Sequence, residues 1–176
     1  MKKYFTLTAF ALLGSFILTS CATENDDRTD YDTYSVVYDL INATFSSAND
    51  FTLYYNFPST LNTYSSDVVL VYRKKDVYSG NSVWEQIPKT VYFDAGKELD
   101  YDFDFTVNDV RIFVQGNYDL VTTTTPAGYL NNQTFRIVLV PANYIHKSVT
   151  PIDYSDYNAV INYYNIDDTK VTEINF

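Results

Sequence analysis

The chain has little of the chemistry on which most active sites and metal centres depend. Its 176 residues contain one cysteine, one histidine and five glycines. A single cysteine excludes a disulfide within the chain, and a single histidine excludes a multi-histidine metal site. The glycines stand alone, so they do not form the glycine-rich loops that hold phosphates or dinucleotides. We therefore expect a protein that is not an enzyme, with no catalytic residues, no metal ligands and no cofactor.

Basic residues are also few, because 12 lysines and arginines face 22 acidic residues and leave a net charge of −10. A nucleic-acid partner requires a basic footprint for its phosphates. Anionic lipid headgroups likewise attract basic rather than acidic segments. We expect no nucleic-acid partner and no peripheral binding to anionic headgroups.

The first twenty residues have the layout of a secretory signal peptide. Lys2 and Lys3 precede an apolar run at 4–18, YFTLTAFALLGSFIL, which is too short to suit a dedicated membrane span. The next residues complete Leu18-Thr19-Ser20-Cys21, which resembles a lipobox, the cleavage motif of the lipoprotein signal peptidase. This resemblance implies that the Cys21 sulfur forms a thioether to diacylglycerol, whose acyl chains include palmitate, and that cleavage leaves the lipidated Cys21 as the new N-terminus. The alternative is a buried N-terminal helix.

An acidic stretch, ATENDDRTDYDTY, follows Cys21 and should remain solvated. Its acids resemble the export signal of surface-exposed lipoproteins in the Bacteroidota. We predict a cleaved signal peptide at 1–20, a lipidated tether at 21–33 and one β-rich domain at 34–176. Loss of two lysines from a net charge of −10 gives the mature chain −12. We expect a lipid anchor in the outer membrane and favour its outer surface. The periplasmic face is the alternative.

Alternation of apolar and polar residues predicts that the domain is mainly β. In LDYDFDFTV at 99–107, apolar residues from Leu99 to Val107 alternate with Asp100, Asp102, Asp104 and Thr106, as in a strand with one buried face. FTLYYNF at 51–57 repeats the pattern and places Tyr54 on the opposite, outward face. Further short strands are separated by turn residues: YSVVYDLINATF, VVLVYRK, VWEQIP, TVYF, VRIFVQ and FRIVLVPA. This series predicts an antiparallel β-sandwich-like domain.

Two segments, DVVLVY and FRIVLV, are apolar on both faces, so their sheet requires a cover on its second side. Near the C-terminus, Tyr157, Val160, Ile161 and Tyr164 have the spacing of an apolar helical stripe. We predict one short helix at 156–164 with Ser155 as its N-cap, packed on that sheet. A strand over 157–164 is the alternative. KVTEINF then forms a final strand.

Three stretches in this order behind a lipoprotein signal resemble small uncharacterised lipoproteins of the Bacteroidota: VWEQIP, DFDFTVNDVRIFVQG and FRIVLVPA. The resemblance implies a β-sandwich-like domain and supplies no catalytic residues.

Two features could indicate chemistry. Asp100, Asp102 and Asp104 resemble the start of a calcium loop, but Phe105 and Arg111 stand where an EF-hand requires glycine and glutamate. We interpret the three acids as a solvated strand face, with a weak surface cation site as the alternative. His146 could serve a hydrolase, but no G-x-S-x-G motif accompanies it, and an ordinary surface histidine is the simpler reading.

Eighteen tyrosines are more than one core face requires. Many suit pleated strands, with the ring buried and the hydroxyl solvated. Exposed ones such as Tyr54 could instead stack on sugar rings. We favour a lipid-anchored, non-enzymatic interaction or structural domain, attached to the membrane through Cys21, with a glycan or an envelope protein as partner. The alternatives are a carbohydrate-binding accessory protein using exposed tyrosines, and a hydrolase.

Overall fold

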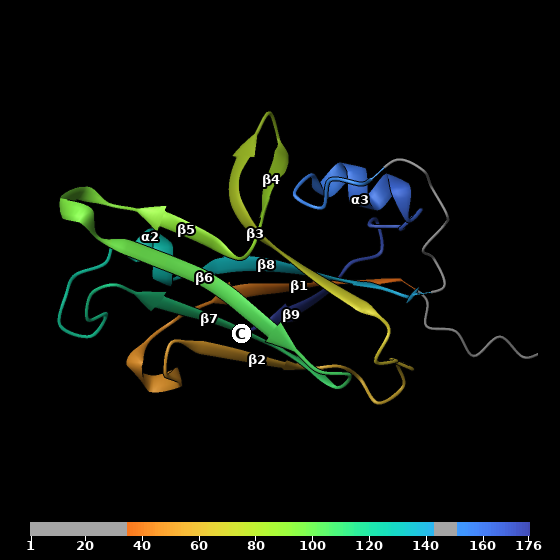
Figure 1. Ribbon diagram of the computed structural model, residues 1–176, viewed down its shortest axis with the longest axis horizontal. Helices are drawn as coiled ribbons and strands as arrows, with labels where there is room; N and C mark the ends of the chain where they lie inside the picture. The colour runs from red at the N-terminus through yellow and green to blue at the C-terminus, as the bar shows by residue number, and fades with distance from the viewer. Residues whose placement is uncertain (1–34, 143–150) are drawn as a thin grey trace, which may run out of the picture. The chain divides into compact units, whose positions relative to one another are not determined.

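Two β-sheets form the body of the domain (Figure 1). The computed structural model describes residues 35–142 and 151–176, which belong to one compact unit. The five-stranded sheet has the order β4-β3-β8-β1-β9, and the four-stranded sheet has the order β2-β7-β6-β5. The strands are β1 (Val36–Ala43), β2 (Thr52–Asn56), β3 (Val68–Tyr78), β4 (Asn81–Gln86), β5 (Lys89–Tyr92), β6 (Glu98–Phe105), β7 (Asp109–Gly116), β8 (Gln133–Val140) and β9 (Thr172–Asn175). Short helical elements join them: η1 (Ser47–Asn49), η2 (Asp94–Gly96), α2 (Ala127–Leu130) and α3 (Tyr157–Tyr163). The predicted mainly β, sandwich-like architecture is confirmed.

The main core fills the space between the two sheets. Both sheets contribute side chains that alternate along their strands, as the period of two requires. The largest fully buried members are Tyr101, Phe45, Phe135, Leu40, Ile87, Leu99, Ile112, Ile137 and Leu139. Phe45 and Phe135 meet edge to face, with ring centroids 5.8 Å apart, a geometry that aromatic pairs prefer.

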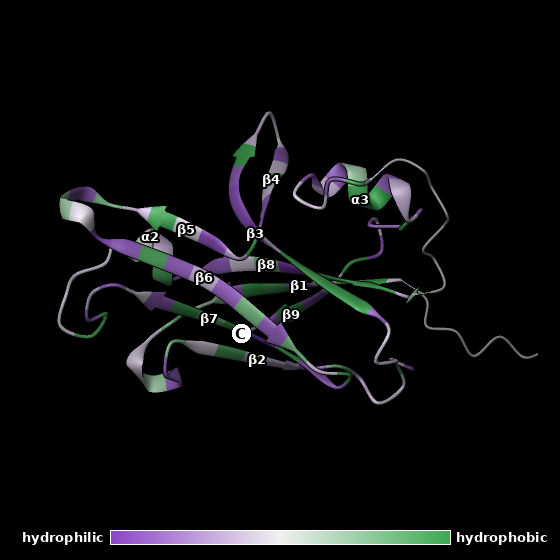
Figure 2. Cartoon of the chain, in the orientation of Figure 1, coloured by the Kyte–Doolittle hydropathy of each residue, from purple (hydrophilic) through white to green (hydrophobic). Residues whose placement is uncertain are grey.

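A second core lies on the outer face of the five-stranded sheet, under α3. β3 is hydrophobic over the part that crosses the sheet and hydrophilic over the next stretch, before a hydrophobic end at the turn into β4 (Figure 2). Val69 and Val71 enter the main core, whereas Leu70 and Tyr72 contact the C-terminal segment. That segment buries Tyr157, Val160, Tyr164 and Ile166 against them. Each fully buried side chain of this size contributes about 1.5–3 kcal/mol. The predicted helical cover is therefore confirmed.

A buried ion pair fastens the same segment to the sheet. Arg136 on β8 donates from Nε and Nη2 to the two carboxylate oxygens of Asp39 on β1, at 2.7 and 2.8 Å. Its Nη1 donates to the Tyr157 hydroxyl at 2.7 Å, and that hydroxyl donates to Asp168 at 2.7 Å. Burial lowers the pKa of Arg136, but the hydrogen bonds and charge of Asp39 outweigh it, so the pKa is raised overall. We call Arg136, Asp39, Tyr157 and Asp168 the C-terminal clamp.

Some sequence-based details are wrong. The N-cap of α3 is Asp156, whose side chain accepts from the Ala159 N–H, and not Ser155. Phe105 and Val107, predicted to face inward, are 44% and 39% exposed. Phe105 is the last residue of β6 and Val107 lies in the following turn, beyond the main core.

The last strand departs from the antiparallel arrangement, because β9 pairs with β1 in parallel. The chain leaves β8, packs α3 on the outer face and then enters the sheet at the edge beyond β1. The connection before β8 contains α2, a single helical turn at Ala127–Leu130. Within residues 35–142 and 151–176, no helix has both the length and the apolar character to cross a membrane.

Substitutions at the middle and at the end of β6 should differ in their effect on the free energy of unfolding. Tyr101 has no exposed surface, and Phe105 is 44% exposed on the same strand. We expect Tyr101→Ala to lower the free energy of unfolding by about 3–5 kcal/mol, because it leaves a cavity in the main core. Phe105→Ala should change it by less than about 1 kcal/mol. Urea unfolding followed by circular dichroism measures both, and equal losses would contradict the assigned faces.

The C-terminal clamp should stabilise the fold through its buried carboxylate. We expect Asp39→Ala to lower the free energy of unfolding by about 3–5 kcal/mol, because it leaves the guanidinium of Arg136 buried without its charge partner. Glu173→Ala is the matched control, since Glu173 is the exposed register neighbour of Asp39 on β9 and should change stability by about 0.5 kcal/mol or less. Thermal melts of both variants test this. A loss for Asp39→Ala no larger than that of the control would show that the pair does not hold the segment.

Candidate binding face

The four-stranded sheet buries one face and exposes the other. Outward positions on its central strands follow the strand period, and the register aligns them in rows across the sheet. Arg111 on β7 lies between Tyr54 on β2 and Asp104 on β6. Phe113 lies in the next row, between Thr52 and Asp102. We call this surface the β2–β7–β6 face, defined by Thr52, Tyr54, Asp100, Asp102, Asp104, Arg111, Phe113 and Gln115.

Arg111 is the centre of the face. Its Nε donates to Asp104 Oδ1 at 3.0 Å, and its Nη2 donates to Asp104 Oδ2. Its guanidinium carbon lies 5.1 Å from the centre of the Phe113 ring. Hydrogen bonding with Asp104, and secondarily with Tyr54, raises the pKa of Arg111 above its ordinary value. The guanidinium is thus held in one orientation while its side chain remains 43% exposed.

The three aspartate side chains along β6 all have partners within the sheet. Asp100 accepts from the Thr90 hydroxyl at 2.5 Å, and Asp102 accepts from the Phe103 N–H at 2.7 Å. Asp104 is paired with Arg111. The strand spaces these carboxylates by roughly 6.6–6.8 Å along the face, which is too far for convergence on one ion. In the described part of the chain, no group of three or more His, Cys, Asp or Glu residues has a metal-holding arrangement.

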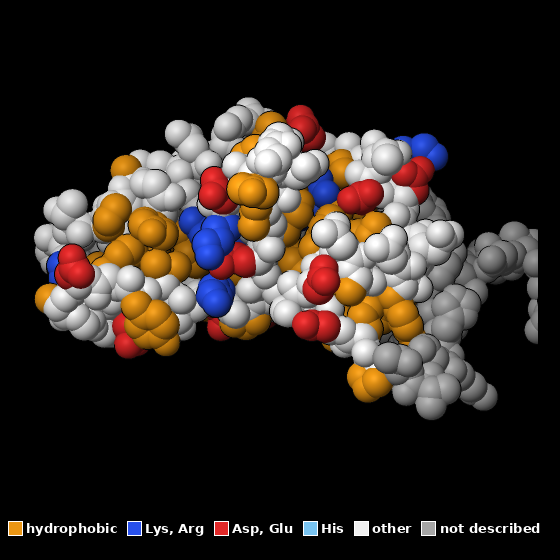
Figure 3. Space-filling view, turned by 90° about the horizontal axis from the view of Figure 1, so that it is seen from above, with side chains coloured by type: hydrophobic (Ala, Val, Ile, Leu, Met, Phe, Trp, Pro, Cys, Tyr) orange, Lys and Arg blue, Asp and Glu red, His pale blue; other side chains and the backbone are white. Residues whose placement is uncertain are grey.

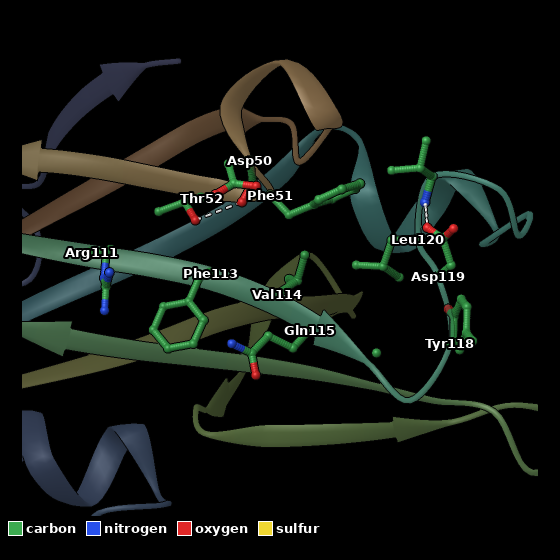
Figure 4. A pocket seen from close by; sticks show the side chains of 12 residues that line it. Asp50, Phe51, Thr52, Arg111, Phe113, Val114, Gln115, Tyr118, Asp119 and Leu120 are labelled. Carbon is green, nitrogen blue, oxygen red and sulfur yellow. Dashed lines mark hydrogen bonds between the residues drawn. The ribbon is translucent and has the colours of Figure 1, made fainter.

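A hollow of about 570 Å³ adjoins this face at the end of β7. Arg111, Phe113 and Gln115 project to the same side of β7, and the start of β2 lies across from them (Figure 4). The hollow forms where β7 continues past β2, because Thr52 is paired with Phe113 and Gln115 has no β2 partner in the register. Tyr118 and Asp119 in the loop after β7 close its far side. The hollow therefore has an aromatic surface for stacking and side chains that can donate or accept hydrogen bonds.

The structure describes only some of the residues that the sequence analysis singled out. Tyr54 is 60% exposed on the outward face, as predicted. Tyr92 is also exposed on this side of the sheet, but its row is that of Glu98 on β6, far from the row of Tyr54. The two tyrosines therefore do not form a continuous platform. Cys21 and His146 lie outside the described residues.

Six of the twelve other tyrosines in the described residues serve packing. Tyr38, Tyr55, Tyr72, Tyr101, Tyr157 and Tyr164 are buried. Burial raises the pKa of Tyr72, and its hydroxyl donates to the Tyr154 carbonyl at 2.8 Å. The interpretation that aromatic residues suit pleated strands holds for the four on strands, Tyr38, Tyr55, Tyr72 and Tyr101, whereas Tyr157 and Tyr164 belong to α3 and its C-cap.

The sequence reasoning missed Arg111, Phe113 and Gln115. Their signal was present in DVRIFVQG, where alternate positions pair a buried aliphatic series with Asp109, Arg111, Phe113 and Gln115. What the alternation could not supply was the register that sets Arg111 beside Asp104 and Tyr54.

Comparison with known proteins gives no match to a family model, to a curated protein or to a solved structure.

Proposed function

We propose that this protein is a lipid-anchored lipoprotein of the cell envelope whose domain binds a partner without catalysing a reaction. In this proposal, residues 1–20 are removed as a signal peptide, Cys21 carries the lipid, and 21–33 tether the domain at 34–176 to the outer membrane. The support is the order of Lys2 and Lys3, the apolar run and Leu18-Thr19-Ser20-Cys21. The resemblance to lipoproteins of the Bacteroidota favours the outer surface.

The β2–β7–β6 face is the observation that carries the binding role. On this face the guanidinium of Arg111 is oriented by Asp104, with Tyr54 beside it on β2 and the Phe113 ring centre 5.1 Å away. Arg111 is oriented by Asp104 and is not covered by other elements. Such pre-positioned groups lose less freedom when a ligand arrives. An envelope protein or a glycan is the proposed partner.

Carbohydrate binding is the second candidate function, and Tyr54 favours it. Tyr54 is 60% exposed, and its ring lies next to Arg111, which is paired in turn with Asp104. A sugar ring presents C–H groups to an aromatic surface and hydroxyls to planar hydrogen-bonding side chains. The adjoining hollow of about 570 Å³ continues the face along β7.

Lipidation depends on the sulfur of Cys21. We expect Cys21→Ser to abolish incorporation of radioactive palmitate and to move the protein from the membrane to the soluble fraction, because serine has no thiol for the thioether. Cell fractionation with palmitate labelling measures this. Ser20→Ala is the control, since it keeps a small residue before the cysteine. Continued labelling of the Cys21→Ser protein would show that the lipobox assignment is wrong.

Glycan binding should depend on Tyr54. On a glycan array, we expect any positive signal to fall about tenfold in Tyr54→Ala, because the sugar would lose its contact with the aromatic ring and a loss of about 1.4 kcal/mol is tenfold in affinity. Tyr92→Ala is the matched control, since Tyr92 is equally accessible on the same sheet but lies in a distant row. An array without any signal, or a signal indifferent to Tyr54, would leave a protein partner as the better candidate.

A further inference from the structure

A groove separates β4 from the start of α3, on the opposite side of the domain from the β2–β7–β6 face. It has a volume of about 760 Å³. We call it the Trp84 groove, and its defining residues are Trp84, Arg136, Asp156, Tyr157, Asn158 and Asp168. Figure 3 looks onto this side of the domain, where acidic side chains gather over the C-terminal segment.

Aromatic rings form one part of the groove. Trp84 on β4 is partly exposed, and the Tyr157 ring centroid lies 5.9 Å from it. The guanidinium carbon of Arg136 lies 4.3 Å from the centre of the Trp84 ring. Trp84 therefore already meets a cation over its ring, as the quadrupole of an indole favours.

Charge decides which ligand the groove suits. The positive charge of Arg136 is matched by the two-oxygen contact with Asp39. Arg136 Nη1 also lies 3.6 Å from Asp168 Oδ2, so its single positive charge is shared by two carboxylates. With Asp156 added, the groove carries an excess of negative charge along the α3 side. Asp156 uses Oδ1 to cap α3, and Asp168 uses Oδ2 for the Tyr157 hydroxyl. Their other oxygens have no hydrogen-bond partner among residues 35–142 and 151–176.

The combination of rings and carboxylates narrows the ligand class. An anion would meet more carboxylates than cations in this groove, and the repulsion is unfavourable. A metal ion would need a ring of oxygen ligands, whereas much of this groove is aromatic. We propose that the Trp84 groove binds an organic cation through an alkylammonium group, which contacts Asp156 and Asp168 and lies against Trp84. This site shares no residue with the β2–β7–β6 face and does not depend on the proposed function.

Trp84 supplies a direct measurement, because it is the only tryptophan in the chain. Its emission, excited where tyrosine does not absorb, reports on the groove alone. We expect putrescine to change the emission of the full-length protein in a saturable way at low ionic strength, and added salt to weaken the effect. The neutral isostere 1,4-butanediol should have no effect. A second arm uses acetyl-Gly-Lys-Gly-amide against its glutamine analogue, which separates a protein lysine from a free amine as the source of the group.

Asp156→Asn removes the negative charge and keeps the N-cap of α3. Asparagine is as good an N-cap as aspartate, so α3 and the melting temperature should be preserved. Loss of one partly solvated charge should weaken ammonium binding about threefold. Asp167→Asn is the matched control, because Asp167 is bound to Lys170 and does not line the groove.

The outcomes are decisive in both directions. Saturable binding of either amine probe, weakened by salt and by Asp156→Asn but not by Asp167→Asn, supports the site. Absence of saturable change with both amines overturns it. An equal response to 1,4-butanediol, or binding indifferent to Asp156→Asn, overturns the ammonium assignment even if the emission changes.

Discussion

The five-stranded sheet has to be buried on both of its faces, and the rest of the domain is arranged around that constraint. Val69 and Val71 point to one side of β3, and Leu70 and Tyr72 point to the other. Apolar surface of this extent left in water would cost about 25 cal/mol for each Å². The four-stranded sheet covers the inner side, and the C-terminal segment covers the outer side. Removal of either cover would expose an apolar sheet face.

The four-stranded sheet, in contrast, has one face that is open to solvent. The four-stranded sheet needs to bury only the face that meets the main core, so its outward positions are released from packing. Tyr54, Arg111 and Gln115 occupy such positions. Because these side chains stand on strands and not on loops, their spacing is set by the backbone register. The relative positions of these side chains are therefore set by the fold itself.

The sequence was sufficient for features that depend on local period. Alternation predicted the strands and the outward direction of Tyr54, and the helical stripe predicted α3 with its buried Val160. The sequence predicted the wrong N-cap for α3, because Ser155 and Asp156 are adjacent and both residue types are favourable N-caps. It also failed for contacts between residues distant in sequence. Asp39 and Arg136 are 97 positions apart, and no local pattern indicates that they meet. The parallel entry of β9 and the row of Tyr54, Arg111 and Asp104 have the same origin in register.

The two arginines show how burial changes the part that one residue type plays. Arg111 is paired with Asp104 on an exposed face, where water screens the attraction and the pair contributes orientation more than stability. Arg136 is paired with Asp39 in a nearly closed setting, where both side chains are close to nine-tenths buried. There the loss of one partner leaves a charge that water cannot reach. The buried pair therefore fixes the C-terminal segment, and by fixing Tyr157 and Asp168 it also fixes the wall of the Trp84 groove. Because the groove takes its shape from a group that the fold itself requires, any ligand there meets a surface already ordered by the core.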